Sequence, residues 1–199
     1  MGESSWNGYE RNCFFYNVGD GHFLDVARAT GGDALRDSRA VAIVDLDGDG
    51  RLDIITNNNN APPSVFLNQA SQTGDWLSLG LIGAGSHIAT DDLRGGRTYG
   101  SPRDAVGTKV SLQLRSKEGL PKTVTRWLSA GSGYASQSPL ALHFGLGREQ
   151  VMESLEITWP SGRRQRLPGG DVAVNNHQII QEADTIAGAD IPPPHSRIQ

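Results

Sequence analysis

The most constraining feature of the sequence is an acidic loop at residues 45–53, which lies between two short apolar runs. The loop has the pattern D-x-D-x-D-G-x-x-D, and its alternate carboxylates converge if the chain curls. Gly48 and Gly50 permit that curl because glycine tolerates a positive φ. The flanking runs, residues 40–44 and 52–55, are short and rich in valine and isoleucine, which favours strands. The pattern therefore predicts two strands joined by a metal-binding turn.

The loop predicts a calcium site. Carboxylates and one backbone carbonyl would supply the ligands, and hard oxygen donors in this number suit Ca²⁺ better than Zn²⁺. The sequence argues against an EF-hand, because the twelfth position of that loop needs a bidentate glutamate and Thr56 stands there. A solvated acidic turn without metal is the alternative. The expected ligands are the carboxylates of Asp45, Asp47, Asp49 and Asp53, and the carbonyl of Arg51.

Glycine and proline content supports a chain of short strands. The 199 residues include 25 glycines and 10 prolines, which disfavours a helical bundle and favours strands joined by tight turns. A net charge of −4 without a basic block argues against nucleic-acid binding. No apolar run approaches the ~20 residues that span a bilayer. Residues 1–5 carry no signal-peptide pattern, and Cys13 has no second cysteine with which to pair.

Alternating apolar residues predict an all-β fold built of short antiparallel strands. A hairpin is expected over residues 12–26, with its turn at Asp20 and Gly21. A further short strand is expected at 65–67, after a polar turn at 57–60. The second half predicts strands bounded by Gly, Pro or Ser, a spacing typical of a β-sandwich or barrel. They lie at 76–82, 106–114, 124–128, 140–144, 155–159 and 178–180.

The first part of the chain resembles the FG-GAP or VCBS repeat of β-propellers. The acidic loop is the specific element, and residues 17–23 (NVGDGHF) resemble the segment that often precedes it. Residues 66–68 (FLN) resemble the short strand that follows. The resemblance implies a single propeller-blade-like, calcium-binding repeat over residues 1–70. A single blade cannot close a propeller, so its edges need to be covered.

The second part resembles the ASPIC/UnbV domain of cartilage-acidic-protein-like and bacterial proteins. Four segments carry the resemblance in the family's order: RDAVGTKV at 103–110, GSGYASQS at 131–138, HFGLG at 143–147 and WPSG at 159–162. It implies a β-sandwich-like domain at residues 71–185. The proline run at 192–194 predicts an extended Pro-rich tail at residues 186–199. It also implies an extracytoplasmic setting, periplasmic or secreted.

These features predict a non-enzymatic, calcium-stabilised β module that binds other protein chains, as an accessory subunit of a larger assembly. The five histidines are scattered and show no metal-protease spacing, so no catalytic residues are expected. One alternative is a carbohydrate-binding module whose site is formed by the long loop and the tryptophans, Trp127 and Trp159 among them. Another is a natural-product biosynthetic enzyme of the ASPIC/UnbV type, which would need a pocket of convergent side chains.

Two segments contain too few apolar side chains to pack by themselves, residues 83–101 and 187–199. Ordering a backbone costs about 1–2 kcal/mol per residue, and contact with other chains would offset that cost. We therefore expect one or both segments to lie on an interface.

Overall fold

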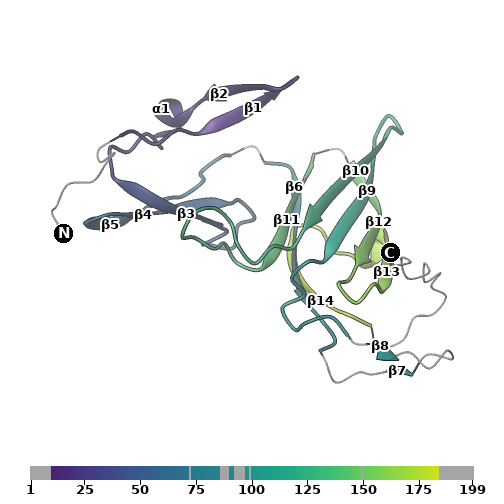
Figure 1. Cartoon of the computed structure of the whole chain (residues 1–199). Helices are drawn as coiled ribbons and strands as arrows, with labels where there is room; N and C mark the ends of the chain where they lie inside the picture. The colour runs from purple at the N-terminus through teal and green to yellow at the C-terminus, as the bar shows by residue number, and fades with distance from the viewer. Residues whose placement is uncertain are drawn as a thin grey trace, which may run out of the picture. The chain divides into compact units, whose positions relative to one another are not determined.

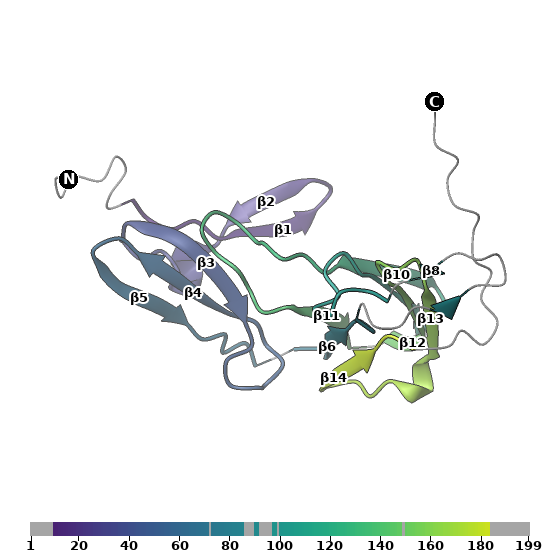
Figure 2. The same cartoon turned by 60° about the horizontal axis from the view of Figure 1, so that its bottom comes forward.

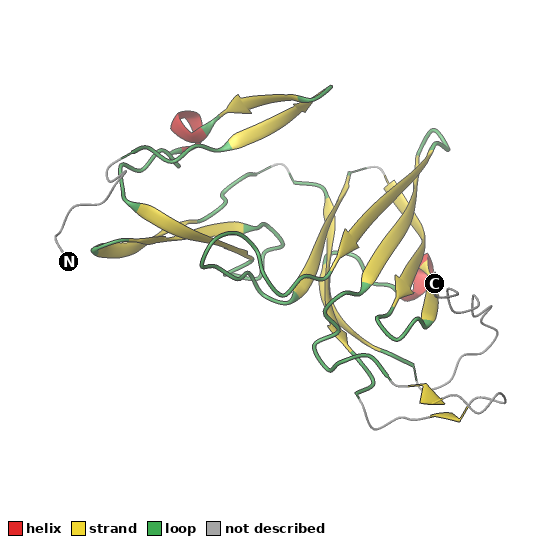
Figure 3. Ribbon diagram, in the orientation of Figure 1, coloured by secondary structure: helices red, strands yellow, loops and turns green. Residues whose placement is uncertain are grey.

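The computed structural model describes residues 10–71, 73–85, 90–91, 97–98, 100–148 and 150–183. Its regular secondary structure in these residues is almost all strand, with one short α-helix and one short 3-10 helix (Figures 1 and 3), so the predicted all-β class is confirmed. The chain divides into two compact units. Unit 1 comprises Met1–Ala70 and Gly131–Pro139, and unit 2 comprises Ser71–Ala130 and Leu140–Gln199.

Unit 1 begins with the expected hairpin, formed by β1 (Phe15–Gly19) and β2 (His22–Asp25). Its turn lies at Asp20 and Gly21, as predicted, and both residues adopt a positive φ. The four-residue helix α1 (Ala27–Thr30) follows, held by the Asp25 carboxylate, whose Oδ1 accepts the N–H groups of Phe14 and Ala27 at 3.0 Å. These two backbone hydrogen bonds lower the pKa of Asp25 below its usual value.

A three-stranded antiparallel sheet completes unit 1, in the order β3 (Ser38–Val44), β4 (Asp53–Asn58) and β5 (Ala61–Phe66) (Figure 2). Strand β5 contains Pro62 and Pro63, which an edge strand tolerates because an outward N–H has no partner in the sheet. The segment 131–139 reaches the other edge, where the Ser138 hydroxyl accepts the N–H of Ile43 at 3.1 Å.

Unit 2 contains two larger sheets. One has four antiparallel strands in the order β10 (Pro121–Trp127), β9 (Lys109–Ser116), β12 (Gln150–Thr158) and β13 (Arg164–Pro168). The other has the order β11 (Ala141–Gly147), β6 (Asp75–Ile82) and β14 (Asn176–Gln181), and β14 runs parallel to β6. The 3-10 helix η1 (Gly169–Asp171) follows β13, and β7 (Thr90–Asp91) pairs with β8 (Arg97–Thr98).

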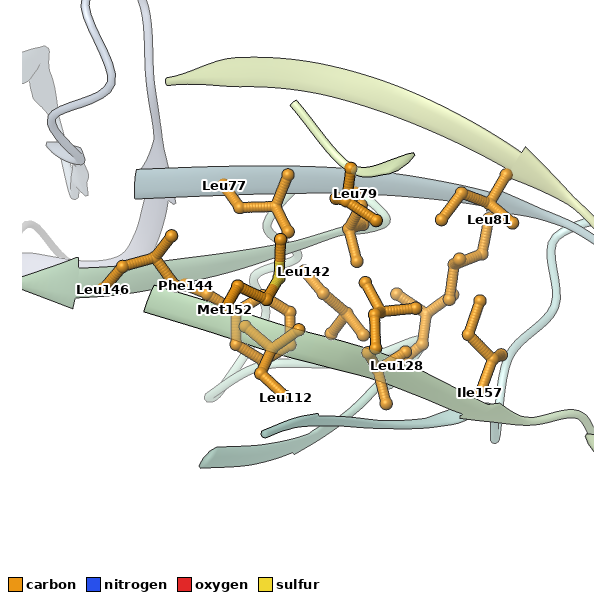
Figure 4. Packing of buried hydrophobic residues seen from close by; sticks show 14 of the residues in the cluster. Leu77, Leu79, Leu81, Leu112, Leu128, Leu142, Phe144, Leu146, Met152 and Ile157 are labelled. Carbon is orange, nitrogen blue, oxygen red and sulfur yellow. The ribbon is translucent and has the colours of Figure 1, made fainter. Parts of the chain in front are cut away.

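The two sheets of unit 2 enclose one hydrophobic core (Figure 4). Alternate residues of each strand point inward, as expected for a sandwich with one solvated face per sheet. Burying each large apolar side chain contributes about 1.5–3 kcal/mol, so this layer holds the unit together. The inward residues are Leu77, Leu79 and Leu81 of β6, Leu142, Phe144 and Leu146 of β11, Val110, Leu112 and Leu114 of β9, and Met152, Leu155 and Ile157 of β12.

Unit 1 has no comparable core. Among its described residues, Ala27 is the only buried hydrophobic one. Every residue of β1 and β2 is exposed, and the sheet strands present further apolar side chains to solvent. The exposed large hydrophobic residues of unit 1 include Phe15, Tyr16, Val18, Phe23, Leu24, Leu35, Val41, Ile43, Val65 and Leu67.

Glu182, just after β14, forms a buried polar junction in unit 2. Its Oε2 accepts the N–H groups of Ala84 at 2.8 Å and Ser101 at 2.7 Å, and its Oε1 accepts the Ser161 hydroxyl. The Arg163 guanidinium lies 3.8 Å from Oε1. Burial acts to raise the pKa of Glu182, but the hydrogen bonds outweigh it, and the pKa lies below the usual value. One ionised carboxylate therefore joins three separate stretches of chain.

No helix in the part of the chain that the structure describes is long and apolar enough to cross a membrane.

Candidate metal centre

The acidic loop folds as a tight turn between the end of β3 and the start of β4. Gly48 and Gly50 adopt φ values of 77° and 84°, as the curl requires. The carboxylate of Asp45 organises the turn from within. Its Oδ1 accepts the N–H groups of Gly48 at 2.8 Å and Asp49 at 3.1 Å, and its Oδ2 accepts that of Gly50 at 2.8 Å.

Three of the predicted ligands lie together. Asp45, Asp47 and Asp49 each offer a carboxylate oxygen, and these oxygens lie within 4.8 Å of one another. Ligands on opposite sides of a Ca²⁺ ion, each at about 2.3–2.6 Å, would be separated by about 5 Å. The spacing and the all-oxygen donor set therefore fit a calcium ion, which would also relieve the repulsion between the three carboxylates.

Asp53 does not join this cluster. Its side chain is buried, with 2% of the residue exposed, and both oxygens accept backbone N–H groups. Oδ2 accepts that of Leu46 at 2.9 Å and Oδ1 that of Asn68 at 2.8 Å. The carboxylate thus joins the start of the loop to the chain that leaves β5. In this arrangement Asp53 holds the loop in shape.

Arg51 contacts the cluster through its side chain. The guanidinium forms an ion pair with the Asp49 carboxylate, and Nε donates a hydrogen bond to the Asn68 carbonyl at 2.6 Å. The Arg51 N–H also donates to Asp49 Oδ1 at 2.8 Å. The acidic pattern predicted only the carbonyl of Arg51 as part of the site, which stays a prediction, and it predicted no role in the site for Asn68. The one available signal was the position of Asn68 directly after an apolar strand.

The two tryptophans considered for a sugar platform lie in different environments. Trp159 is buried, with 2% exposed, and its Nε1 donates a hydrogen bond to Gln165 Oε1 at 3.2 Å. Trp127 is 62% exposed, and the Lys109 ammonium lies 5.7 Å from its ring centroid. Trp127 and Trp159 therefore do not form a flat exposed pair.

The segments expected at an interface fall mostly outside the described residues. Positions 86–89, 92–96 and 99 of the long loop, and the tail from residue 184 onward, lie outside that range. The expectation for these segments remains a prediction.

Comparison with protein families gives two matches in the predicted order. Residues 4–56 match the FG-GAP-like repeat, and residues 96–187 match the family described as ASPIC and UnbV. These matches confirm the resemblance that the sequence motifs indicated. The first match includes the three clustered aspartates, and the second includes most of the strands of unit 2.

Three curated relatives carry the name cartilage acidic protein 1. The protein of Xenopus tropicalis is 32% identical over 155 residues, which cover 74% of this chain and 18% of the relative. Those of Mus musculus and Homo sapiens are 33% and 32% identical over 124 residues, which cover 61% of this chain and 16% of each relative. The matched region therefore spans less than a fifth of the length of these relatives.

Proposed function

Since the chain joins an FG-GAP-like repeat to an ASPIC and UnbV domain, we propose that it is a non-enzymatic, calcium-stabilised β module that binds other proteins. The proposed role is that of an accessory subunit in a larger extracytoplasmic assembly. Outside the cytoplasm, free Ca²⁺ is high enough to fill sites with dissociation constants of about 10⁻⁴–10⁻³ M.

The observation that carries the proposal is the exposed apolar surface of unit 1. A hairpin of two strands is at best marginally stable in water, yet β1 and β2 expose aromatic and aliphatic side chains on both faces. Tyr16 and Leu24, for example, form an exposed cross-strand pair. Contiguous exposed apolar surface of this kind marks protein interaction sites. Burial against a partner would supply the free energy that unit 1 lacks internally.

Support for calcium comes from the three converging carboxylates. Isothermal titration calorimetry on the metal-free chain should detect one Ca²⁺ per chain, and Asp47→Asn should weaken binding at least tenfold. Asp47 is the informative position because its carboxylate is exposed and accepts one long hydrogen bond, from the Asp49 N–H at 3.3 Å. A folded chain that binds no Ca²⁺ would refute the calcium part of the proposal.

The interaction part is tested on the protein isolated from its natural source under mild conditions. A partner should co-purify with the wild-type protein in fixed stoichiometry. The amount of this partner should fall at least tenfold in the double variant Tyr16→Ser, Leu24→Ser. Trp127→Ser, which removes an equally exposed aromatic side chain from unit 2, is the matched control and should keep that partner. Equal losses in both variants, or a protein isolated as a monomer, would overturn the proposal.

A further inference from the structure

A cavity of about 370 Å³ lies within unit 1, on one face of the β3–β4 pair. Its walls are largely apolar, contributed by Phe14, Val41, Ile54 and Tyr134. Phe14 is fixed against the sheet by an edge-to-face contact with Phe66, whose ring centroid lies 5.9 Å away. The volume of the cavity is at the lower end of the range for small-ligand pockets, so the cavity can accept one large side chain.

Two residues that line the same cavity each carry an unsatisfied polar group. Among the described residues, three buried side-chain polar atoms have no hydrogen-bond partner, and two of them are Asn12 Nδ2 and Thr56 Oγ1. Only 5% of the surface of Thr56 is exposed. Leaving a buried hydroxyl or amide group unpaired is unfavourable, so a ligand whose hydrogen-bonding atoms reach these two groups would gain binding free energy from pairing them.

The edge of the sheet beside the cavity offers a third element of recognition. In an antiparallel strand the N–H and C=O of a residue point to the same side, and successive residues alternate. The Ile43 N–H points away from β4, toward Ser138, so the backbone groups of Val41 also point away from β4. Within the described part of the chain, those two groups make no hydrogen bond. Val41 thus presents one donor and one acceptor at the rim of the cavity.

From these three features we infer that the cavity binds an extended peptide segment, with an apolar side chain in the cavity and its own backbone paired with Val41. The partial charges are complementary, because an extended residue presents an acceptor and a donor to the donor and acceptor of Val41. The Thr56 hydroxyl and the Asn12 amide then meet the neighbouring peptide groups. This inference rests on the proposed interaction role and assigns it a second surface, separate from the β1–β2 hairpin.

The test uses two capped pentapeptides, Thr-Val-Phe-Val-Thr and Thr-Val-Ala-Val-Thr, titrated into the whole calcium-loaded chain. NMR shifts of the Val41 backbone amide and the Asn12 side-chain amide report binding. Alkylation of Cys13 gives a second readout, because it is the single cysteine and lines the cavity. The phenylalanine peptide should bind at least tenfold more tightly than the alanine peptide and should slow alkylation.

Val41→Pro removes the edge donor without breaking the β3–β4 ladder and should weaken peptide binding at least tenfold. Val65→Pro is the matched control. Val65 also lies on an edge strand of this sheet, with its N–H outward, but on the opposite edge. Thr56→Val, which removes only the hydroxyl, should weaken binding at least threefold and provides a second variant if a proline substitution unfolds the sheet.

Equal affinities for the two peptides, or equal effects of the two proline variants, would overturn the inference. A third outcome would also overturn it: phenol binds as tightly as the phenylalanine peptide, and Val41→Pro does not change the affinity for phenol. The cavity would then be a small-molecule site. The proposed function fails separately. If the hairpin variants keep their partner while Val41→Pro weakens peptide binding, the hairpin proposal is wrong and the cavity inference stands.

Discussion

At the scale of single residues, the four aspartates of the acidic loop divide into two kinds. Asp47 is exposed and makes one long hydrogen bond within the loop, so its carboxylate is free to bind a cation. Asp53 is buried, and each of its oxygens already accepts a backbone N–H. We therefore expect the same residue type in one motif to contribute to stability by two different physical routes, Asp47 through a bound cation and Asp53 through backbone hydrogen bonds.

The difference predicts opposite calcium dependence. Asp47→Ala should lower the melting temperature in calcium but cost little in EDTA, because ligand binding stabilises only the folded loop. Asp53→Asn should cost about 1–3 kcal/mol in both conditions, since it places an amide donor opposite a backbone donor. Thermal denaturation of both variants, with and without EDTA, measures this. An equal loss for Asp47→Ala in the two buffers would assign that carboxylate a purely structural role.

Glu182 predicts an acid-sensitive contribution to the stability of unit 2. Its pKa in the folded state lies below the unfolded value, so its contribution is present above the unfolded pKa and is lost as the pH falls through the folded pKa. Glu182→Gln should cost about 1–3 kcal/mol at pH 7, because one oxygen that accepts hydrogen bonds is replaced by a donor. Urea denaturation between pH 7 and pH 3 should show the gap from wild type shrinking. A constant gap would contradict this account.

At the scale of secondary-structure elements, close packing beside β12 predicts contrasting effects at two adjacent glycines. A Cβ on Gly169 would lie 1.7 Å from the Met152 carbonyl oxygen, whereas one on Gly170 would meet nothing within 4 Å. Gly169→Ala should therefore cost about 1–3 kcal/mol through forced movement of β12. Gly170→Ala should stay within about 0.5 kcal/mol of wild type. Chemical denaturation measures both, and similar values would mean that η1 shifts without cost.

The short-range alternation of apolar and polar residues predicted most of the strands. The hairpin turn at Asp20 and the strands of the core follow directly from local alternation. Strand β13 was missed because Leu167 is its only large apolar residue, and its pairing depends on contacts such as Arg166 with Glu156 across the sheet. The parallel pairing of β14 with β6 joins residues about a hundred positions apart, and alternation carries no information about such pairing.

Short-range spacing also predicted part of the candidate metal site. The spacing of Asp45, Asp47 and Asp49 was sufficient to place three carboxylates together. The pattern could not indicate that Asp53 would lie outside the cluster of three carboxylates and join the loop to the chain after β5, because Asn68, whose N–H it accepts, comes fifteen residues later. Nor could it indicate that the Arg51 guanidinium would reach Asp49. The contacts of Asp53 and Arg51 with Asn68 depend on where β5 ends, which is a property of the folded sheet.

At the scale of the whole molecule, stability is distributed unevenly. The hydrophobic cluster lies entirely in unit 2, while unit 1 depends on hairpin and sheet hydrogen bonds and on its loop. Hydrogen exchange followed by mass spectrometry should find β3 and β4 less protected than β6 and β9 in EDTA. Calcium should slow exchange in β3 and β4 at least tenfold and leave β6 and β9 nearly unchanged. Uniform protection without calcium would show that unit 1 needs no ion.

The membership of residues 131–139 in unit 1 has a consequence for how the protein is made. Residues 71–130, which belong to unit 2, are synthesised before this segment. A nascent chain that has just left the ribosome up to residue 70 therefore lacks the Ser138 hydroxyl that accepts the Ile43 N–H at the edge of β3. The unit whose sequence begins first is thus completed only after much of the later unit has been translated, and no single cut in the gene separates the two.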